Sequence, residues 1–242
     1  MNALNLFSNK ELYLCEHNNR GRLYSLANMP TNKKRKIIYD NMQLMDGMNF
    51  TPTWQFPILR KYIGPVDFDC VPFSKWRKCT GKNQAVHFFL YDYRFRDSVW
   101  CNLEHTTYNL SKFDYFFTPD LSLWRDLPTN FYNIQNLYRT RFIGAYWQLC
   151  GFNVIPTASW GNIDSFSYCF EGLPNNSIIA VSGMGNQRTR NAYNLWCYGL
   201  QRLEEEKQPI MIIIYGAEIK IPNIHTPIKF IPDFISTKLR KL

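Results

Sequence analysis

The chain has 242 residues and a formal net charge of +9, with 45% hydrophobic, 17% aromatic and 19% charged residues. This apolar content can bury a sizeable core, so a largely disordered chain is excluded, and the length suits one α/β domain. The positive charge favours a polyanionic partner, of which nucleic acid is the commonest inside a cell.

Cysteine usage and the absence of targeting patterns indicate a reducing compartment. The seven cysteines are odd in number and form no CxxC pair, so neither a zinc site nor a disulfide framework is predicted. The first twenty residues have no apolar core of a signal peptide, and no apolar run reaches the roughly 20 residues that span a bilayer. We therefore expect a cytoplasmic protein without a membrane partner.

Residues 1–50 are polar and Asn-rich, and they carry a basic run of Lys33, Lys34, Arg35 and Lys36. We predict an N-terminal basic extension over 1–50, with one or two helices, and an α/β domain over 51–242. Such a basic run usually forms a solvated face, and the alternative is contact with the phosphate backbone of nucleic acid.

The domain begins with short stretches typical of strands. They cover 53–59, 66–73, 86–91 and 113–118, and residues 97–111 between the last two suit a helix or a long loop. The stretch 86–91 is apolar on both faces, which indicates a strand covered on both sides.

The second half alternates strands with helices. In chain order, the predicted elements are a helix over 130–150, a strand over 153–159, a helix over 164–170, a strand over 177–181, a helix over 191–207 and strands over 210–215 and 228–231. Crossovers of about 25–35 residues are typical of right-handed βαβ units. We predict a small or partial (β/α) barrel, with an open doubly wound parallel sheet as the alternative.

In both architectures a ligand binds at the carboxyl ends of the strands, so the residues there are candidates for a site. Asp92 and Asp120 are the candidate catalytic residues, because two neighbouring carboxylates could bind a divalent cation or divide acid and base roles. The alternatives are a turn or helix-cap role for Asp120 and an ion pair of Asp92 with Arg94 or Arg96.

Other strand ends supply candidate substrate-binding residues. They are Tyr91, Arg94, Thr157, Ser159, Trp160, Ser182, Gly183, Gly185, Arg188 and Tyr215. The turn 182–185 precedes a helix and could hold a phosphate, or it could be a plain tight turn. Arg188 stands where a dinucleotide fingerprint has its third glycine, so no such cofactor is predicted. Trp160 could stack on a base or a sugar, or simply pack.

None of the four histidines belongs to an HxH or HExxH pattern, which disfavours a paired-histidine nuclease. His87 lies within an apolar strand, so we expect a core histidine. The sequence also contains no P-loop and no nucleophile elbow.

Several stretches resemble a family known only as a domain of unknown function, which is carried by bacterial phages, plasmids and integrated elements. The resemblance covers roughly residues 85–235, and its best motifs are Thr118-Pro119-Asp120-Leu121-Ser122 and Pro156-Thr157-Ala158-Ser159-Trp160. It implies a mobile-element setting, with the host cytoplasm as location for a phage protein, and it supplies no activity.

Two hypotheses follow from these patterns. The first is an enzyme for a phosphate-containing, nucleotide or nucleic-acid substrate, with Asp92 and Asp120 as metal ligands or acid/base groups. The second is a non-catalytic nucleic-acid-binding or host-interacting accessory protein, whose affinity would come from the basic run at 33–36 and from the basic tail at 238–241.

Overall fold

The computed structural model describes residues 16–17, 23–24, 40–186 and 188–233. The chain divides into two compact units, residues 1–49 and 50–242. In the first unit, β1 (Glu16–His17) pairs antiparallel with β2 (Leu23–Tyr24), and η2 (Met42–Leu44) is a 3-10 helix. Lys33, Lys34, Arg35 and Lys36 lie outside the described residues, so their contact with nucleic acid stays a prediction.

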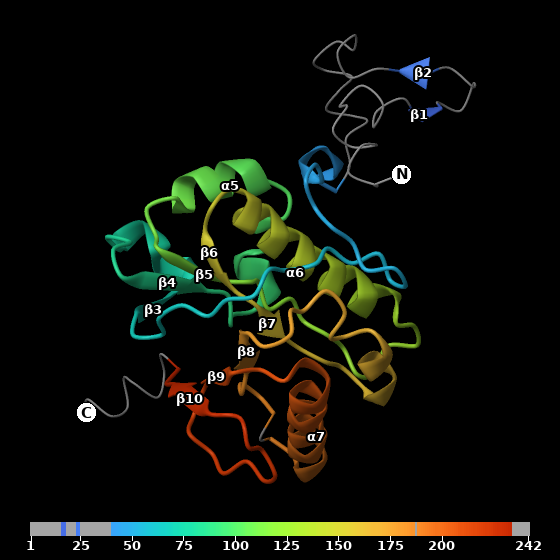
Figure 1. Ribbon diagram of the computed structural model, residues 1–242, viewed down its shortest axis with the longest axis vertical. Coiled ribbons are helices and arrows are strands. Elements are labelled where there is room, and N and C mark those ends of the chain that lie inside the picture. The colour runs from blue at the N-terminus through green and yellow to red at the C-terminus, as the bar shows by residue number, and fades with distance from the viewer. Residues whose placement is uncertain (1–15, 18–22, 25–39, 187, 234–242) are drawn as a thin grey trace. The chain divides into compact units, whose positions relative to one another are not determined.

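The second unit contains two four-stranded parallel sheets (Figure 1). The first has the order β3-β4-β5-β6 and the second β10-β9-β8-β7. Their bounds are β3 (Asp69–Pro72), β4 (Gln84–His87), β5 (Tyr115–Phe117), β6 (Asn153–Ile155), β7 (Thr157–Ala158), β8 (Ile178–Ser182), β9 (Met211–Tyr215) and β10 (Ile228–Ile231).

Helices connect most of these strands in the manner of parallel crossovers. Between β4 and β5 lie η4 (Asp92–Arg94), α4 (Arg96–Val99) and α5 (Leu103–Leu110). The longer α6 (Phe131–Leu149) and α7 (Arg190–Lys207) precede β6 and β9, while η3 (Phe73–Lys78) and η5 (Ile163–Ser167) are 3-10 helices. The α/β class is confirmed. The strand pairs found among the described residues form two sheets and no closed ring, so a barrel stays a prediction.

Pro156 separates β6 from β7 within one extended stretch. Before it, Ile155 pairs with Phe117 of β5, and after it, Thr157 pairs with Ala180 of β8. Proline has no N–H to donate to a ladder, but its carbonyl still accepts a hydrogen bond from Ala180 N at 2.8 Å. This stretch therefore joins the two sheets.

Alternate residues of both sheets face one apolar core. Its buried members are Tyr62, Ala85, Phe89, Phe117, Ile155, Ile178, Ala180, Ile213 and Tyr215. Because successive side chains of a strand point to opposite faces, this shared cluster indicates that the inner faces of the two sheets turn toward each other.

Four predicted elements differ from the structure: the strand over 153–159 is split at Pro156, the strand over 86–91 is β4 at Gln84–His87, and the elements over 53–59 and 164–170 differ as follows. Residues 53–59 form no strand: Phe50 makes an isolated bridge to Pro57, and Thr51 Oγ1 accepts a hydrogen bond from Phe56 N at 3.1 Å. Pro57 removes a ladder donor within the predicted strand, and Gln55 has a left-handed backbone with φ of 55°, which interrupts an extended stretch. The helix expected over 164–170 is the shorter 3-10 helix η5.

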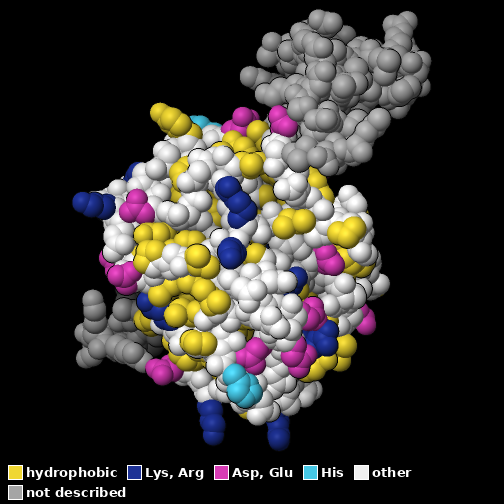
Figure 2. Space-filling view, in the orientation of Figure 1, with side chains coloured by type: hydrophobic (Ala, Val, Ile, Leu, Met, Phe, Trp, Pro, Cys, Tyr) yellow, Lys and Arg dark blue, Asp and Glu magenta, His cyan; other side chains and the backbone are white. Residues whose placement is uncertain are grey.

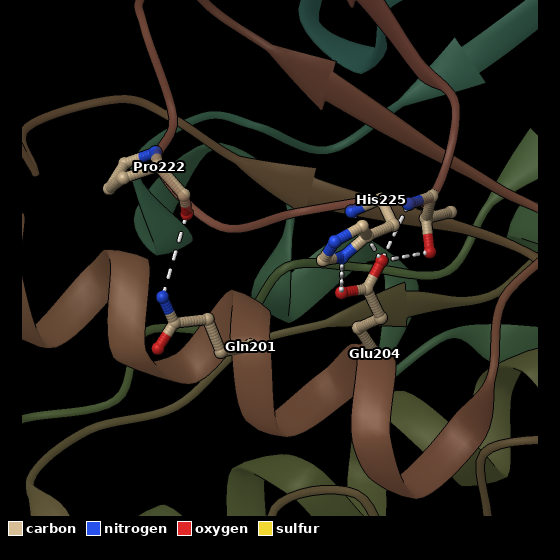
Figure 3. A network of polar contacts seen from close by, with 5 residues as sticks. Gln201, Glu204, Pro222 and His225 are labelled. Atoms are coloured by element: carbon tan, nitrogen blue, oxygen red, sulfur yellow. Dashed lines mark hydrogen bonds and ion pairs between the residues drawn. The ribbon is translucent and has the colours of Figure 1, made fainter.

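Glu204 on α7 holds the segment that precedes β10 (Figure 3). Its Oε1 accepts hydrogen bonds from the backbone N of His225 at 2.9 Å and from Thr226 N and Oγ1 at 2.5 and 2.6 Å. Burial alone would raise the pKa of Glu204, but these hydrogen bonds outweigh it and lower the pKa below its ordinary value. No helix of the described part is long and apolar enough to cross a membrane.

Candidate functional site

A pocket of about 650 Å³ opens at the carboxyl ends of the strands in the second unit. Residues at or after the carboxyl ends of β3, β4, β5, β7, β8, β9 and β10 all line it, so both sheets contribute. Nine of the residues predicted from strand ends are among them: Tyr91, Arg94, Asp120, Ser159, Trp160, Ser182, Gly185, Arg188 and Tyr215.

Asp120 is the carboxylate of this pocket with the most unusual environment. It follows Pro119, whose carbonyl accepts a hydrogen bond from Thr140 Oγ1 on α6 at 2.9 Å, which fixes the loop after β5. No donor to the Asp120 carboxylate is found within the part of the chain that the structure describes. Burial, followed by the nearby negative charge of Asp92, raises the pKa of Asp120 to about 7. Such a carboxyl can exchange a proton at neutral pH.

Asp92 does not line the pocket, and its side chain holds the loop that carries Asp120. Its carboxylate accepts hydrogen bonds from Ser122 N at 3.2 Å and from Ser122 Oγ at 2.8 Å. The alternative of an ion pair with Arg94 or Arg96 is not found among the described residues, where Arg96 pairs with Asp97 at 3.3 Å. Asp92 therefore links the segment after β4 to the loop after β5.

Three arginines, Arg94, Arg125 and Arg188, line the pocket together with Asp120 and Asp233. Arg125 donates a hydrogen bond to Asn186 Oδ1 at 3.0 Å, and none of the three forms an ion pair with a carboxylate among the described residues. Guanidinium groups whose charge is not neutralised nearby favour an anionic ligand, such as a phosphate.

The turn after β8 is held by its own hydrogen bonds. Gly183 N donates to Tyr215 O at 2.8 Å, and Met184 N donates to Ser182 Oγ at 3.3 Å. Ser182 O accepts from Trp196 Nε1 at 2.9 Å. These two backbone N–H groups are therefore already engaged and are not available to a phosphate at this turn, where the nearby arginines supply positive charge.

Trp160 forms a wall of the pocket and is only 8% exposed. A Cβ at Gly199 on α7 would lie 2.1 Å from the indole, so the glycine is what lets the ring pack there. The tryptophan is fixed between α7 and the rings of Phe166 and Phe170. It can present an edge or part of a face to a ligand without moving.

Thr157 is buried next to the pocket residue Ala158 and does not itself line the pocket. Its N donates to Thr118 Oγ1 at 2.7 Å and its Oγ1 donates to Thr118 O at 2.9 Å. Arg141, fully buried on α6, donates to three backbone carbonyls, those of Thr157, Cys169 and Glu171. Burial lowers the pKa of this guanidinium to about 10. The hydrogen bonds of Thr157 and Arg141 therefore fix the backbone that leads into the pocket.

His87 belongs to the core beneath the pocket, where its ring centroid lies 4.4 Å from that of Tyr215. Burial lowers its pKa to about 3, so the imidazole is neutral at physiological pH. Its Nδ1 is buried with no hydrogen-bond partner in the described part of the chain.

Several pocket residues were not predicted from the sequence: Ser74, Ser122, Arg125, Asn186, Trp196 and Asp233. Asp233 follows the last strand directly, so the strand-end rule that selected Asp120 could have found it. Arg125 and Trp196 lie farther from strand ends and carry no such signal.

The described residues contain no group of three or more His, Cys, Asp or Glu side chains placed to hold a metal ion. Asp92 and Asp120 therefore form a pair at most. A divalent cation bound there would take its remaining ligands from water or from a substrate.

The fold and pocket define an α/β protein with a pocket of mixed polar and apolar lining at the carboxyl ends of parallel strands. The chain belongs to the DUF4417 family, described as a domain of unknown function, whose model matches residues 48–232. It is similar to the "Gene 1 protein" of Mycobacterium phage L5, with 36% identity over 184 residues, covering 74% of this chain and 78% of the relative. It is also similar to the "Gene 1 protein" of Mycobacterium phage D29, with 42% identity over 132 residues, covering 54% of this chain and 48% of that relative.

No solved structure matches the chain. The expected resemblance to a phage-carried domain of unknown function is confirmed by the family match and by these two relatives.

Proposed function

We propose that this protein is an enzyme that acts on a phosphate-containing, nucleotide-type substrate in the pocket, with Asp120 as the proton-transfer group. The observation that carries the proposal is the carboxyl of Asp120, whose pKa is about 7, in a pocket that three arginines also line. A group with a pKa near the working pH is well suited to general acid–base catalysis.

The proposed reaction is hydrolysis of a phosphate ester. Ionised Asp120 accepts a proton from a water molecule as the water oxygen bonds to phosphorus, and the bond from phosphorus to the leaving oxygen breaks. The leaving oxygen takes a proton from solvent or from protonated Asp120. Arg94, Arg125 and Arg188 would neutralise the charge on the phosphoryl oxygens, which is where most catalytic stabilisation of such reactions arises.

Asp92 is a positioning residue in this proposal. It raises the pKa of Asp120 through its charge and anchors the Asp120 loop through Ser122. Tyr91, Ser159, Trp160, Ser182, Gly183, Gly185 and Tyr215 would shape the space for the remainder of the substrate.

The alternative is a non-catalytic nucleic-acid-binding or host-interacting protein. In that case Lys33, Lys34, Arg35 and Lys36 carry the affinity, and binding to nucleic acid weakens steeply with salt and on neutralising these residues. Replacement of Asp120 by Asn then leaves binding unchanged.

The test compares Asp120→Asn with the wild type on bis-p-nitrophenyl phosphate, nucleoside phosphates and short oligonucleotides. We expect a loss of about 10²- to 10⁴-fold in kcat/KM, with an unchanged circular dichroism spectrum. The wild-type kcat/KM should rise with pH through an inflection near 7. Asp97→Asn, which removes an exposed carboxylate, serves as the control. An equal rate in Asp120→Asn and the wild type would remove Asp120 from the mechanism.

A further inference from the structure

Two strongly exposed tyrosines stand at the mouth of the pocket. The side chains of Tyr91 and Tyr93 are 70% and 71% exposed, and their rings stack with centroids 5.9 Å apart and an interplanar angle of 12°. The guanidinium carbon of Arg94 lies 5.3 Å from the Tyr93 ring centroid. Large aromatic rings left open to water beside a cation are typical of surfaces that bind a flat, anionic partner.

This tyrosine pair is continuous with the pocket and is held in a fixed place. Tyr91 and Arg94 line the pocket, whereas Tyr93 lies outside its lining. Arg94 N donates to Tyr91 O at 2.9 Å, which closes the turn that carries both rings. Asp92, between the two tyrosines, is hydrogen-bonded to Ser122 in the loop that carries Asp120. The distance from the ring pair to Asp120 is therefore set by the fold.

We propose that the substrate is a single-stranded nucleic acid. One base stacks on the Tyr91–Tyr93 pair, Arg94 contacts the phosphate that follows, and the next nucleotide enters the pocket and reaches Asp120. This inference rests on the proposed function, since it assigns the substrate class of the same pocket.

The pocket size and the chemistry of the rim favour a single strand over a duplex. A pocket of about 650 Å³ has the size of a small-molecule site, so it admits one nucleotide and not a base pair with its backbones. In a duplex the base faces are already stacked, and both the tyrosine pair and the pocket would require bases to be pulled out. Aromatic rings that take bases beside positively charged groups are the usual means of binding single strands.

The experiment measures binding of the full chain to fluorescein-labelled (dT)12 by fluorescence anisotropy, with thymidine 5′-monophosphate as an unlabelled competitor. We expect (dT)12 to bind at least about 10-fold more tightly than the mononucleotide, and Tyr93→Ala to weaken (dT)12 binding by about 10-fold. Tyr93→Phe should stay within about threefold of the wild type, since the ring remains. Because Tyr93 lies outside the pocket, its replacement should leave the inhibition constant of the mononucleotide unchanged.

Tyr108→Ala is the matched control, because Tyr108 is 78% exposed and does not line the pocket. The proposal is overturned if Tyr91→Ala and Tyr93→Ala together weaken (dT)12 binding no more than Tyr108→Ala does. It is also overturned if duplex DNA of the same length binds as tightly and shows the same response to the tyrosine changes. A protein partner in place of nucleic acid would give the first of these results.

The failure of this inference and that of the proposed function give different results. If the tyrosine changes weaken strand binding but Asp120→Asn alters no phosphate-ester cleavage, the substrate class stands and the catalytic role of Asp120 fails. If Asp120→Asn abolishes cleavage of small esters while the tyrosine changes leave strand binding unaltered, the proposed function stands and the single-strand assignment fails.

Discussion

Replacing Asp120 by Asn should stabilise the protein at alkaline pH, whatever the substrate is. The carboxyl is partly exposed to the pocket but otherwise surrounded by protein, and its pKa is raised by burial and by Asp92. In the unfolded chain the carboxyl ionises freely, so above pH 7 its charge favours unfolding. Asparagine has nearly the same shape and no charge, and its introduction removes this penalty.

The size of the effect follows from the pKa. A rise from 3.8 to about 7 corresponds to roughly 4 kcal/mol against ionisation in the folded state. Since water in the pocket screens part of this, we expect Asp120→Asn to raise the free energy of unfolding by about 2 to 3 kcal/mol at pH 8. Linkage gives the sign. The raised folded-state pKa of Asp120 means that the folded protein is most stable, relative to the unfolded chain, below pH 4, and this stability is lost as the pH rises through about 7.

Urea unfolding followed by tryptophan fluorescence at pH 5 and pH 8 measures this difference. The gap between Asp120→Asn and the wild type should shrink by more than half at pH 5, because the wild-type carboxyl is then mostly protonated in the folded state. Asp97→Asn should show no such pH-dependent gain, since Asp97 is 76% exposed. A variant at position 120 that is no more stable than the wild type at pH 8 would show that this carboxyl carries no electrostatic penalty.

Three further changes test how the pocket is supported. Gly199→Ala should lower the free energy of unfolding by about 1 to 3 kcal/mol in a urea titration, because the new methyl group would overlap the Trp160 indole. An unchanged urea midpoint would contradict that packing. Arg141→Met should cost about 3 kcal/mol or more, seen as a lower thermal midpoint, because three buried carbonyls lose their donor, and Arg141→Lys should recover part of it. Glu204→Gln should lower the free energy of unfolding by about 1 to 2 kcal/mol at pH 7, and this gap should close as the pH falls through the lowered folded-state pKa of Glu204. Glu205→Gln, which removes an exposed carboxylate on the same helix, is the control.

Net charge by itself did not locate the site. Lys and Arg side chains are scattered over the face drawn in Figure 2, among acidic and apolar ones. Of the three arginines that line the pocket, Arg94 and Arg188 were predicted from the sequence, and Arg125 was found only from the structure. Of these, Arg94 and Arg188 lie close to strand ends in the sequence, whereas Arg125 does not.

The amino-acid sequence was sufficient to predict the α/β class, most strand positions and nine residues of the pocket. Strands and helices were predicted from apolar runs and helical spacing, which are local patterns in the sequence. The pocket residues were predicted because parallel strands place their carboxyl ends together. The split of 153–159 at Pro156 was foreseeable from the missing N–H. Pro57, which also lacks an N–H, likewise argued against a strand over 53–59.

Only the tertiary structure decided what each candidate does. It placed the Asp92 carboxylate on Ser122, thirty residues away in the chain, and left the Asp120 carboxyl with a raised pKa. It placed Thr157 against Thr118, to which it is hydrogen-bonded, and not in the pocket lining. Hydrogen-bond partners, burial and pKa depend on groups brought together from distant parts of the chain, and no local pattern of residues contains that information.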